Sequence, residues 1–237
     1  MNEPPTNNGN WRPVAAPIFN APVIVLVLIG VLVAIHAALQ FGGGSWQTEA
    51  LFLFALIPAR FTATAIPMLQ GSQYWSLLTY GLLHADWMHL AFNSLWLLVF
   101  GTPAARYLGT PRFLLLCSIA TMAGGLASLA LHWGEVVFVL GASAAVSGLL
   151  AAAIPIMYGR RVAGGWRPLS PRELLGDRRA LLFMGIWLLV TLASEAASWT
   201  GNSFVPEGGI AWEAHLGGFL GGIAGFYALA RRNVQAR

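Results

Sequence analysis

Six long apolar stretches dominate the sequence and constrain its fold more than any other feature. They cover approximately residues 20–40, 86–106, 112–132, 141–158, 180–198 and 209–230. A membrane-spanning helix needs about 20 mostly apolar residues, and these stretches are close to that length. Only 9% of the residues are charged, compared with about 25% in soluble domains. The sequence therefore predicts an all-α, polytopic membrane bundle of six transmembrane helices.

The basic residues, all arginines, indicate how this bundle is oriented. If the N-terminus is cytoplasmic, every arginine except Arg60 falls on the cytoplasmic side, as the positive-inside rule requires. We therefore predict cytoplasmic N- and C-termini, with a polar, disordered segment at 1–16, a six-span domain at 17–231 and a short tail at 232–237. Because the first apolar stretch lacks the pattern of a cleaved signal peptide, we expect a retained anchor and a bacterial inner-membrane location. The arginines are scattered among the loops and form no patch, so we do not expect the protein to bind nucleic acid. We expect it to be embedded in the lipid bilayer.

The predicted outer loop is too long to be a simple connector, and the predicted inner loop is strongly basic. The outer loop 41–85 contains an apolar run, 51–57, that is too short to span a membrane. We favour a segment lying in the outer interface, and a buried loop segment is the alternative. The inner loop 159–179 contains six arginines, and Ser170 and Glu173 have the spacing of a capping box. This spacing predicts a short basic helix on the anionic inner leaflet; a solvated charged loop is equally compatible.

Four polar side chains from three predicted spans fall at a similar depth. The second, fourth and sixth spans all start at the outer face, and His89 and Asn93 share one face of the second span. Ser143 is the third residue of the fourth span, and His215 lies about six residues into the sixth. At 1.5 Å per residue these positions are roughly 5–10 Å below the helix starts. Polar groups inside a membrane are expensive and usually functional, so this agreement predicts a site in the outer leaflet.

The chemistry of these four side chains assigns a role to each. A serine hydroxyl becomes nucleophilic when a neighbouring base accepts its proton, and neutral histidine suits that task near pH 7. We assign Ser143 as nucleophile and His215 as base, and we expect Glu213 to point elsewhere, which leaves a dyad. Free N–H groups at the start of the fourth span, with Asn93 and His89, can stabilise an oxyanion. The alternatives are a packing serine at position 143 and interhelical hydrogen bonding by Asn93.

Small residues predict which helices pack closely. Gly217, Gly221 and Gly225 recur every four residues, and Gly218 and Gly222 do so on the adjacent face. Such small-xxx-small patterns let membrane helices approach one another. For His215 to reach Ser143, the sixth span must pack on the fourth, whose start is also rich in small residues.

Three motifs together resemble the rhomboid family of intramembrane serine proteases. They are Gly141-Ala142-Ser143 with Gly148, the run from His84 to Asn93, and Ala214-His215-Leu216-Gly217-Gly218 with Gly222. The resemblance implies that Ser143 is the nucleophile, that His215 is the general base, and that His89 and Asn93 hold the oxyanion. It also implies that the substrates are single-pass membrane proteins cut near the outer leaflet, and that the fifth span and the outer loop gate their entry. Ala144 stands where the family often has glycine, and Ser147 where some members have tyrosine.

Two other functions deserve comparison with proteolysis. A catalytically inactive rhomboid-like protein would bind membrane clients without cutting them, and the presence of Ser143 and His215 argues against it. A small transporter would favour internal repeats and a polar site at the middle of the membrane, which this sequence does not show. No cofactor is expected, and no metal site is expected because there is no HExxH motif and the histidines are dispersed.

Overall fold

A computed structural model describes residues 21–62, 71–163, 165–199 and 211–230. The predicted disordered segment 1–16 and the predicted tail 232–237 lie outside the described residues. Both segments therefore remain predictions.

Each of the six predicted apolar stretches coincides with a helix. These helices are α1 (Val23–Phe41), α4 (Trp87–Leu108), α5 (Thr110–Leu131), α6 (Ser143–Met157), α8 (Arg178–Trp199) and α9 (Trp212–Leu229). Their ends agree with the predicted ends to within three residues. Among the described helices, α1 and α5 are long and apolar enough to cross a membrane, and α6 is apolar but shorter. A mostly helical bundle is thus observed, whereas the count of six spans stays a prediction.

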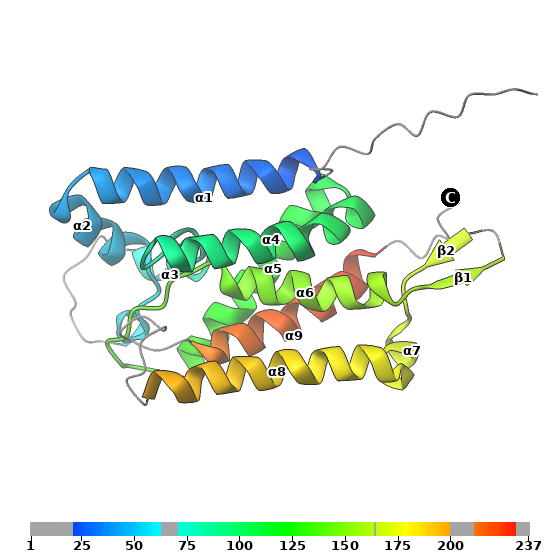
Figure 1. The fold of residues 1–237 in the computed structure, drawn as a ribbon. Coiled ribbons are helices and arrows are strands. Elements are labelled where there is room, and N and C mark those ends of the chain that lie inside the picture. Colours follow the sequence, from blue (N-terminus) through cyan, green and yellow to red (C-terminus); the bar gives the residue numbers. More distant parts are fainter. Residues whose placement is uncertain (1–20, 63–70, 164, 200–210, 231–237) are drawn as a thin grey trace, which may run out of the picture.

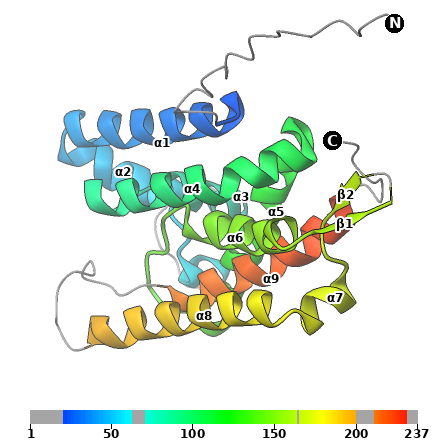
Figure 2. The ribbon, with the colours of Figure 1, turned by 45° about the vertical axis from the view of Figure 1, so that its right-hand side comes forward.

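The bundle is arranged around α6 and α9. In both views α1 and α8 lie on opposite sides of the molecule, with α4, α6 and α9 between them (Figures 1 and 2). Helix α9 packs extensively against both α5 and α6, and α6 also packs against α4 and α5. Every residue of α6 from Val146 to Pro155 is buried. The helix that begins at Ser143 is therefore enclosed by the rest of the bundle.

The outer loop is largely structured. It contains α2 (Gly44–Phe54), α3 (Ser72–Thr79) and the short 3-10 helices η1 (Pro58–Phe61) and η2 (Tyr80–Leu82). Residues 55–57 are fully buried, and the backbone of Leu56 exchanges two hydrogen bonds with that of Val139, at 3.1 and 2.9 Å. The segment expected to lie in the interface is therefore split: its first part belongs to α2, and its last three residues are buried and pair through Leu56 with Val139.

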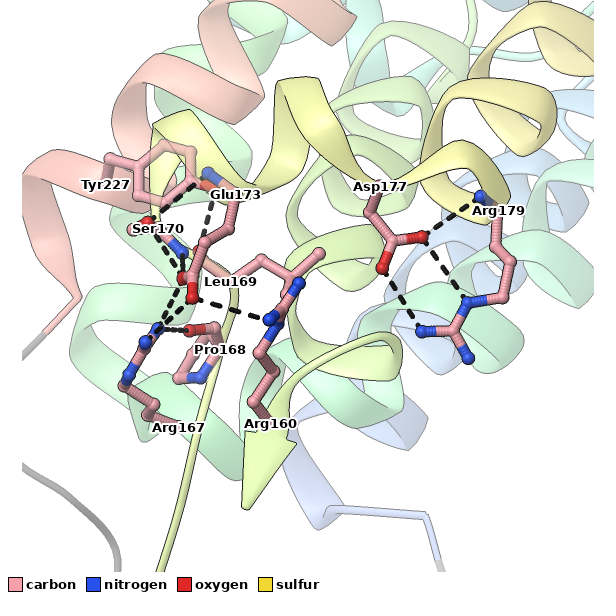
Figure 3. A network of polar contacts seen from close by, with 9 residues as sticks. All are labelled: Arg160, Arg167, Pro168, Leu169, Ser170, Glu173, Asp177, Arg179 and Tyr227. Carbon is pink, nitrogen blue, oxygen red and sulfur yellow. Dashed lines mark hydrogen bonds and ion pairs between the residues drawn. The ribbon is translucent and has the colours of Figure 1, made fainter. Parts of the chain in front are cut away.

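The opposite end of the bundle carries a hairpin and a short helix (Figure 1). Strands β1 (Arg160–Val162) and β2 (Gly165–Arg167) pair in antiparallel fashion, and α7 (Pro171–Gly176) follows. The predicted capping box is confirmed, because Ser170 and Glu173 exchange side-chain to backbone hydrogen bonds. Glu173 also binds the Arg167 guanidinium at 2.6 and 2.9 Å, as Figure 3 shows. The predicted helix is thus present, but it contains only Arg172 of the six arginines, and the described remainder of the segment includes a hairpin with exposed arginines.

The glycines of α9 divide between two neighbours. A methyl group at Gly218 would lie 2.8 Å from backbone atoms of Ala144, and one at Gly222 would meet Gly148. Gly217 faces α5, where a methyl group would lie 2.6 Å from Ala123 O. The predicted close packing of α9 on α6 is confirmed, and the second glycine face is explained by α5.

Candidate active site

Ser143 is the first residue of α6 and is half-buried. Helix α6 has no side-chain hydrogen bond at its N-cap, Ala142. The first N–H groups of a helix have no partner within the helix, so they remain donors around Ser143. The start of α6 therefore combines a hydroxyl with backbone donors suited to an oxyanion.

The loop before Ser143 is fixed by two contacts. The Gly141 N–H donates to Tyr80 O at 3.0 Å, and the buried Tyr80 hydroxyl donates to Thr121 O on α5 at 2.7 Å. Gly141 has a φ of +121°, a conformation that residues with a Cβ rarely adopt. Sequence reasoning identified Gly141 as part of a motif but missed Tyr80, because the bond from the Tyr80 hydroxyl to Thr121 joins residues 41 positions apart.

His215 is the fourth residue of α9. Ala214, which precedes it, packs in the same cluster as Ala144, which follows Ser143. Ala144 and Ala214 belong to one buried apolar cluster that also contains Leu56, Tyr80 and Val139. Both alanines border Gly124 of α5, where a methyl group would lie 2.5 Å from Ala144 Cβ and 2.6 Å from Ala214 O. The structure thus brings the backbone segments that carry Ser143 and His215 into contact.

His89 is the third residue of α4 and lies against Gly141. A methyl group at Gly141 would lie 2.8 Å from His89 Nε2 and 3.7 Å from Ser143 Oγ. The His89 N–H donates to the N-cap Asp86 at 2.8 Å, and the ring of His84 packs edge-on against that of His89. The His89 imidazole and the Ser143 hydroxyl therefore border the same space, the one that the missing side chain of Gly141 leaves open.

Asn93 lies one turn further along α4 and is buried. Its Nδ2 donates to His89 O at 3.0 Å. An asparagine amide has two hydrogens, so this bond within α4 leaves the second hydrogen for another acceptor. All four predicted residues are therefore in first or second turns of α4, α6 and α9.

Glu213 points away from His215, as expected. Its Oε1 accepts a hydrogen bond from Ser128 Oγ on α5 at 2.8 Å. Sequence reasoning missed Ser128 as its partner, because the two residues are 85 positions apart.

Within the described residues, no group of three histidine, cysteine or carboxylate side chains is placed to bind a metal ion.

Comparison with known proteins identifies the family of the chain. A family model described as the Rhomboid domain matches residues 71–232, which is more than half of the chain. The chain is 31% identical over 140 residues to the rhomboid protease GluP of Bacillus subtilis, covering 59% of this chain and 26% of GluP. It is 28% identical over 179 residues to the putative rhomboid protease YdcA of the same species, covering 73% and 79%.

A more distant relative is the rhomboid protease GlpG of Photorhabdus laumondii, 22% identical over 194 residues, covering 78% of this chain and 56% of GlpG. The chain thus spans about a quarter of the length of GluP and just over half that of GlpG. By its matching domain and its relatives, the chain belongs to the rhomboid family of integral membrane proteins, whose members include intramembrane serine proteases.

Proposed function

We propose that this protein is an intramembrane serine endopeptidase with six transmembrane helices. Ser143 and His215 form its catalytic dyad, and Asn93, His89 and backbone N–H groups at the start of α6 form its oxyanion site. The substrates are single-pass membrane proteins, cut in or near their transmembrane segment. The relatives named rhomboid proteases support this proposal.

The reaction follows from the chemistry of these groups. Ser143 Oγ attacks the carbonyl carbon of the substrate peptide bond and gives its proton to the His215 imidazole. The donors around Ser143 stabilise the negative charge on the carbonyl oxygen. His215 then passes the proton to the leaving amine, and the C–N bond breaks to leave an acyl-enzyme. Water, deprotonated by His215, attacks the ester and releases the second product together with free Ser143.

One observation carries this proposal above the others. The His89 ring and the Ser143 hydroxyl border the space left by the missing side chain of Gly141, while Ala144 and Ala214, which adjoin the two members of the dyad, pack in one buried cluster. Residues brought together from three helices, with tight packing around each, hold reacting groups in a defined geometry. A serine used only for helix packing would not require an imidazole such as that of His89 beside its hydroxyl.

The bacterial relatives support a bacterial inner-membrane location, and the distribution of arginines supports cytoplasmic termini. Exposed arginines gather at the end of the bundle that carries the β1–β2 hairpin and α7 (Figure 1), including Arg160, Arg161 and Arg172. Ser143 lies at the opposite end of α6 from this basic end. By the positive-inside rule, the basic end faces the cytoplasm, which puts the dyad toward the outer leaflet.

Cleavage of single-span substrates by the purified protein tests the proposal directly. A panel of such substrates is incubated with wild type, Ser143→Ala, His215→Ala and Ser147→Ala, and the cut sites are mapped by mass spectrometry. We expect cutting near the outer boundary of the substrate helix by wild type and Ser147→Ala only. If wild type neither cuts any substrate nor reacts with a fluorophosphonate at Ser143, the protein is an inactive family member that binds membrane clients.

A further inference from the structure

The first turn of α9 contains a buried carboxyl group that the proposed reaction does not use. Glu213 is 4% exposed and Ser128, its partner, is fully buried. Burying a carboxyl group away from water is costly unless hydrogen bonds compensate it. A residue retained at such a cost, two positions from the proposed base, calls for a reason other than simple space filling.

The partners of Glu213 all come from the end of α5. Ser128 Oγ donates to Glu213 Oε1 at 2.8 Å, and His132 Nε2 lies 3.5 Å from the same oxygen. His132 in turn pairs through Nδ1 with Glu135 Oε2 at 2.8 Å. This set of side chains, Ser128, His132, Glu135 and Glu213, ties the start of α9 to the C-terminal end of α5; we call it the α5–α9 clamp.

The α5–α9 clamp fixes the rotation of α9 about its own axis, which the glycine packing alone does not. Gly217 and Gly221 let α9 approach α5 closely, but a smooth face of small residues does not by itself fix how α9 is rotated. The hydrogen bond between Glu213 and Ser128 fixes this rotation, because a hydrogen bond has a preferred distance and angle. Helix α9 begins after an N-cap, Ala211, that makes no side-chain hydrogen bond, so the clamp is the polar anchor of this first turn.

The rotation of α9 determines where the His215 ring lies. At about 100° per residue, positions 213 and 215 point roughly 200° apart around the helix. With side chains reaching roughly 5–6 Å from the helix axis, a rotation of about 20° would move the His215 ring by about 2 Å. Misplacement of about 1 Å can slow an enzyme about 100-fold.

We propose that Glu213 is a positioning residue: held by Ser128 and His132, it sets the rotation of α9 and thereby places the His215 ring against Ser143. This inference rests on the proposed function, because it assumes that His215 is the base. In this proposal the α5–α9 clamp affects the reaction rate by placing the His215 ring, in addition to stabilising the fold.

Kinetics of three variants separate positioning from stability. Ser128→Ala and Glu213→Ala each lower kcat about ten-fold or more and change KM less than about two-fold, because neither residue touches the substrate. The rate of fluorophosphonate labelling at Ser143 falls in parallel, while the final extent of labelling stays that of wild type. The double variant is no slower than the slower single variant, because both single substitutions break the same contact.

Two matched substitutions on α5 serve as controls. Ser128→Thr keeps a hydroxyl donor at the same position and restores most of kcat. Ser118→Ala removes another α5 serine, whose hydroxyl donates to Leu114 O within α5, and leaves kcat unchanged. If Ser128→Ala and Glu213→Ala lower the melting temperature but keep kcat per labelled site within about two-fold of wild type, the clamp is structural and the inference is wrong.

The position of the ring can also be followed without catalysis. In protein labelled with ¹⁵N-histidine, the His215 signals, assigned with His215→Ala, are expected to shift in Ser128→Ala and to return in Ser128→Thr. Unchanged His215 signals in Ser128→Ala would overturn the inference. If wild type proves inactive, the proposed function fails, whereas these signals still report whether the clamp places the ring.

Discussion

Ala144 and Gly124 fit together across the α5–α6 interface: the methyl group of Ala144 fills the space that the missing side chain of Gly124 leaves. A methyl group at position 124 would lie 2.5 Å from Ala144 Cβ. Ala144 stands where the family often has glycine, and its methyl group is accommodated on the α5 side. The packing next to Ser143 therefore depends on a small residue of another helix.

Gly124→Ala is expected to reduce both stability and activity. The new methyl group would collide with Ala144 Cβ, with Ala214 O at 2.6 Å and with the Tyr80 hydroxyl oxygen at 2.9 Å. Overpacking of this kind costs about 1–3 kcal/mol, and here it pushes apart the segments that carry the dyad. Thermal unfolding in detergent and substrate cleavage measure the two effects. Gly185→Ala, at an open helical position on α8, is the control and should leave both unchanged or slightly raise stability.

Asn93→Ala is expected to lower kcat about 100-fold, the usual effect of removing one oxyanion donor. Ser143 should still react with a fluorophosphonate, because the nucleophile and the base remain. Steady-state cleavage by purified variants checks this result, with Ser94→Ala as the control on the neighbouring position of α4. A kcat for Asn93→Ala equal to that of wild type would remove Asn93 from the oxyanion site and favour a purely structural role within α4.

Tyr80→Phe is expected to destabilise the protein by about 1 kcal/mol. The substitution removes the buried hydroxyl that donates to Thr121 O at 2.7 Å, while the ring and the bond from Gly141 N–H to Tyr80 O remain. Thermal unfolding should show the loss as a melting temperature lower by about 2–4 °C. Tyr74→Phe removes a hydroxyl from an exposed tyrosine and should leave the melting temperature unchanged; equal effects of the two substitutions would contradict the anchoring role of Tyr80.

Acid is expected to weaken the hairpin end of the bundle through Glu173. Hydrogen bonds from the Arg167 guanidinium, and then from the backbone N–H and hydroxyl of Ser170, hold the pKa of the Glu173 carboxyl well below its ordinary value of 4.5. A carboxyl group whose pKa is lowered by folding stabilises the fold above its unfolded pKa. This stabilisation is lost as the pH falls from about 4.5 toward the lower pKa of the folded state.

Comparison of wild type with Glu173→Gln isolates this effect. The difference in melting temperature between the two proteins should be constant from about pH 7 to about pH 5 and should shrink below about pH 4.5. A difference that stays constant down to about pH 3 would show that the contacts of Glu173 with Arg167 and Ser170 do not contribute through its charge. Limited proteolysis of residues 159–177 over the same range locates the loosening.

Periodicity and length were sufficient to predict the main helices. Long apolar stretches that are separated by arginine-containing loops have few alternatives to helical structure in a membrane. Helices therefore occur at the positions that hydropathy predicts, namely α1, α4, α5, α6, α8 and α9. The capping box at Ser170 and Glu173 was equally predictable, because its partners are three residues apart. Small residues spaced by four also indicated that α9 packs closely on α6.

Contacts between distant parts of the chain could not be predicted in this way. The pairing of Leu56 with Val139 uses backbone groups, which every residue has, so no side-chain pattern marks it. The bonds from Tyr80 to Thr121 and from Ser128 to Glu213 join single residues across the bundle. For the candidate site, the sequence indicated which residues have suitable chemistry, whereas the supporting contacts around them emerged from the three-dimensional packing.

The length of α6 has a consequence for how the protein is made. Its 15 residues extend about 22 Å, whereas the hydrocarbon core of a bilayer is about 30 Å thick. Such a segment would be a poor membrane anchor during synthesis, when its later neighbour α9 has not yet emerged from the ribosome. We therefore expect α6 to become stable in the bilayer only after α9 is inserted, so that a nascent chain has no assembled dyad before that point.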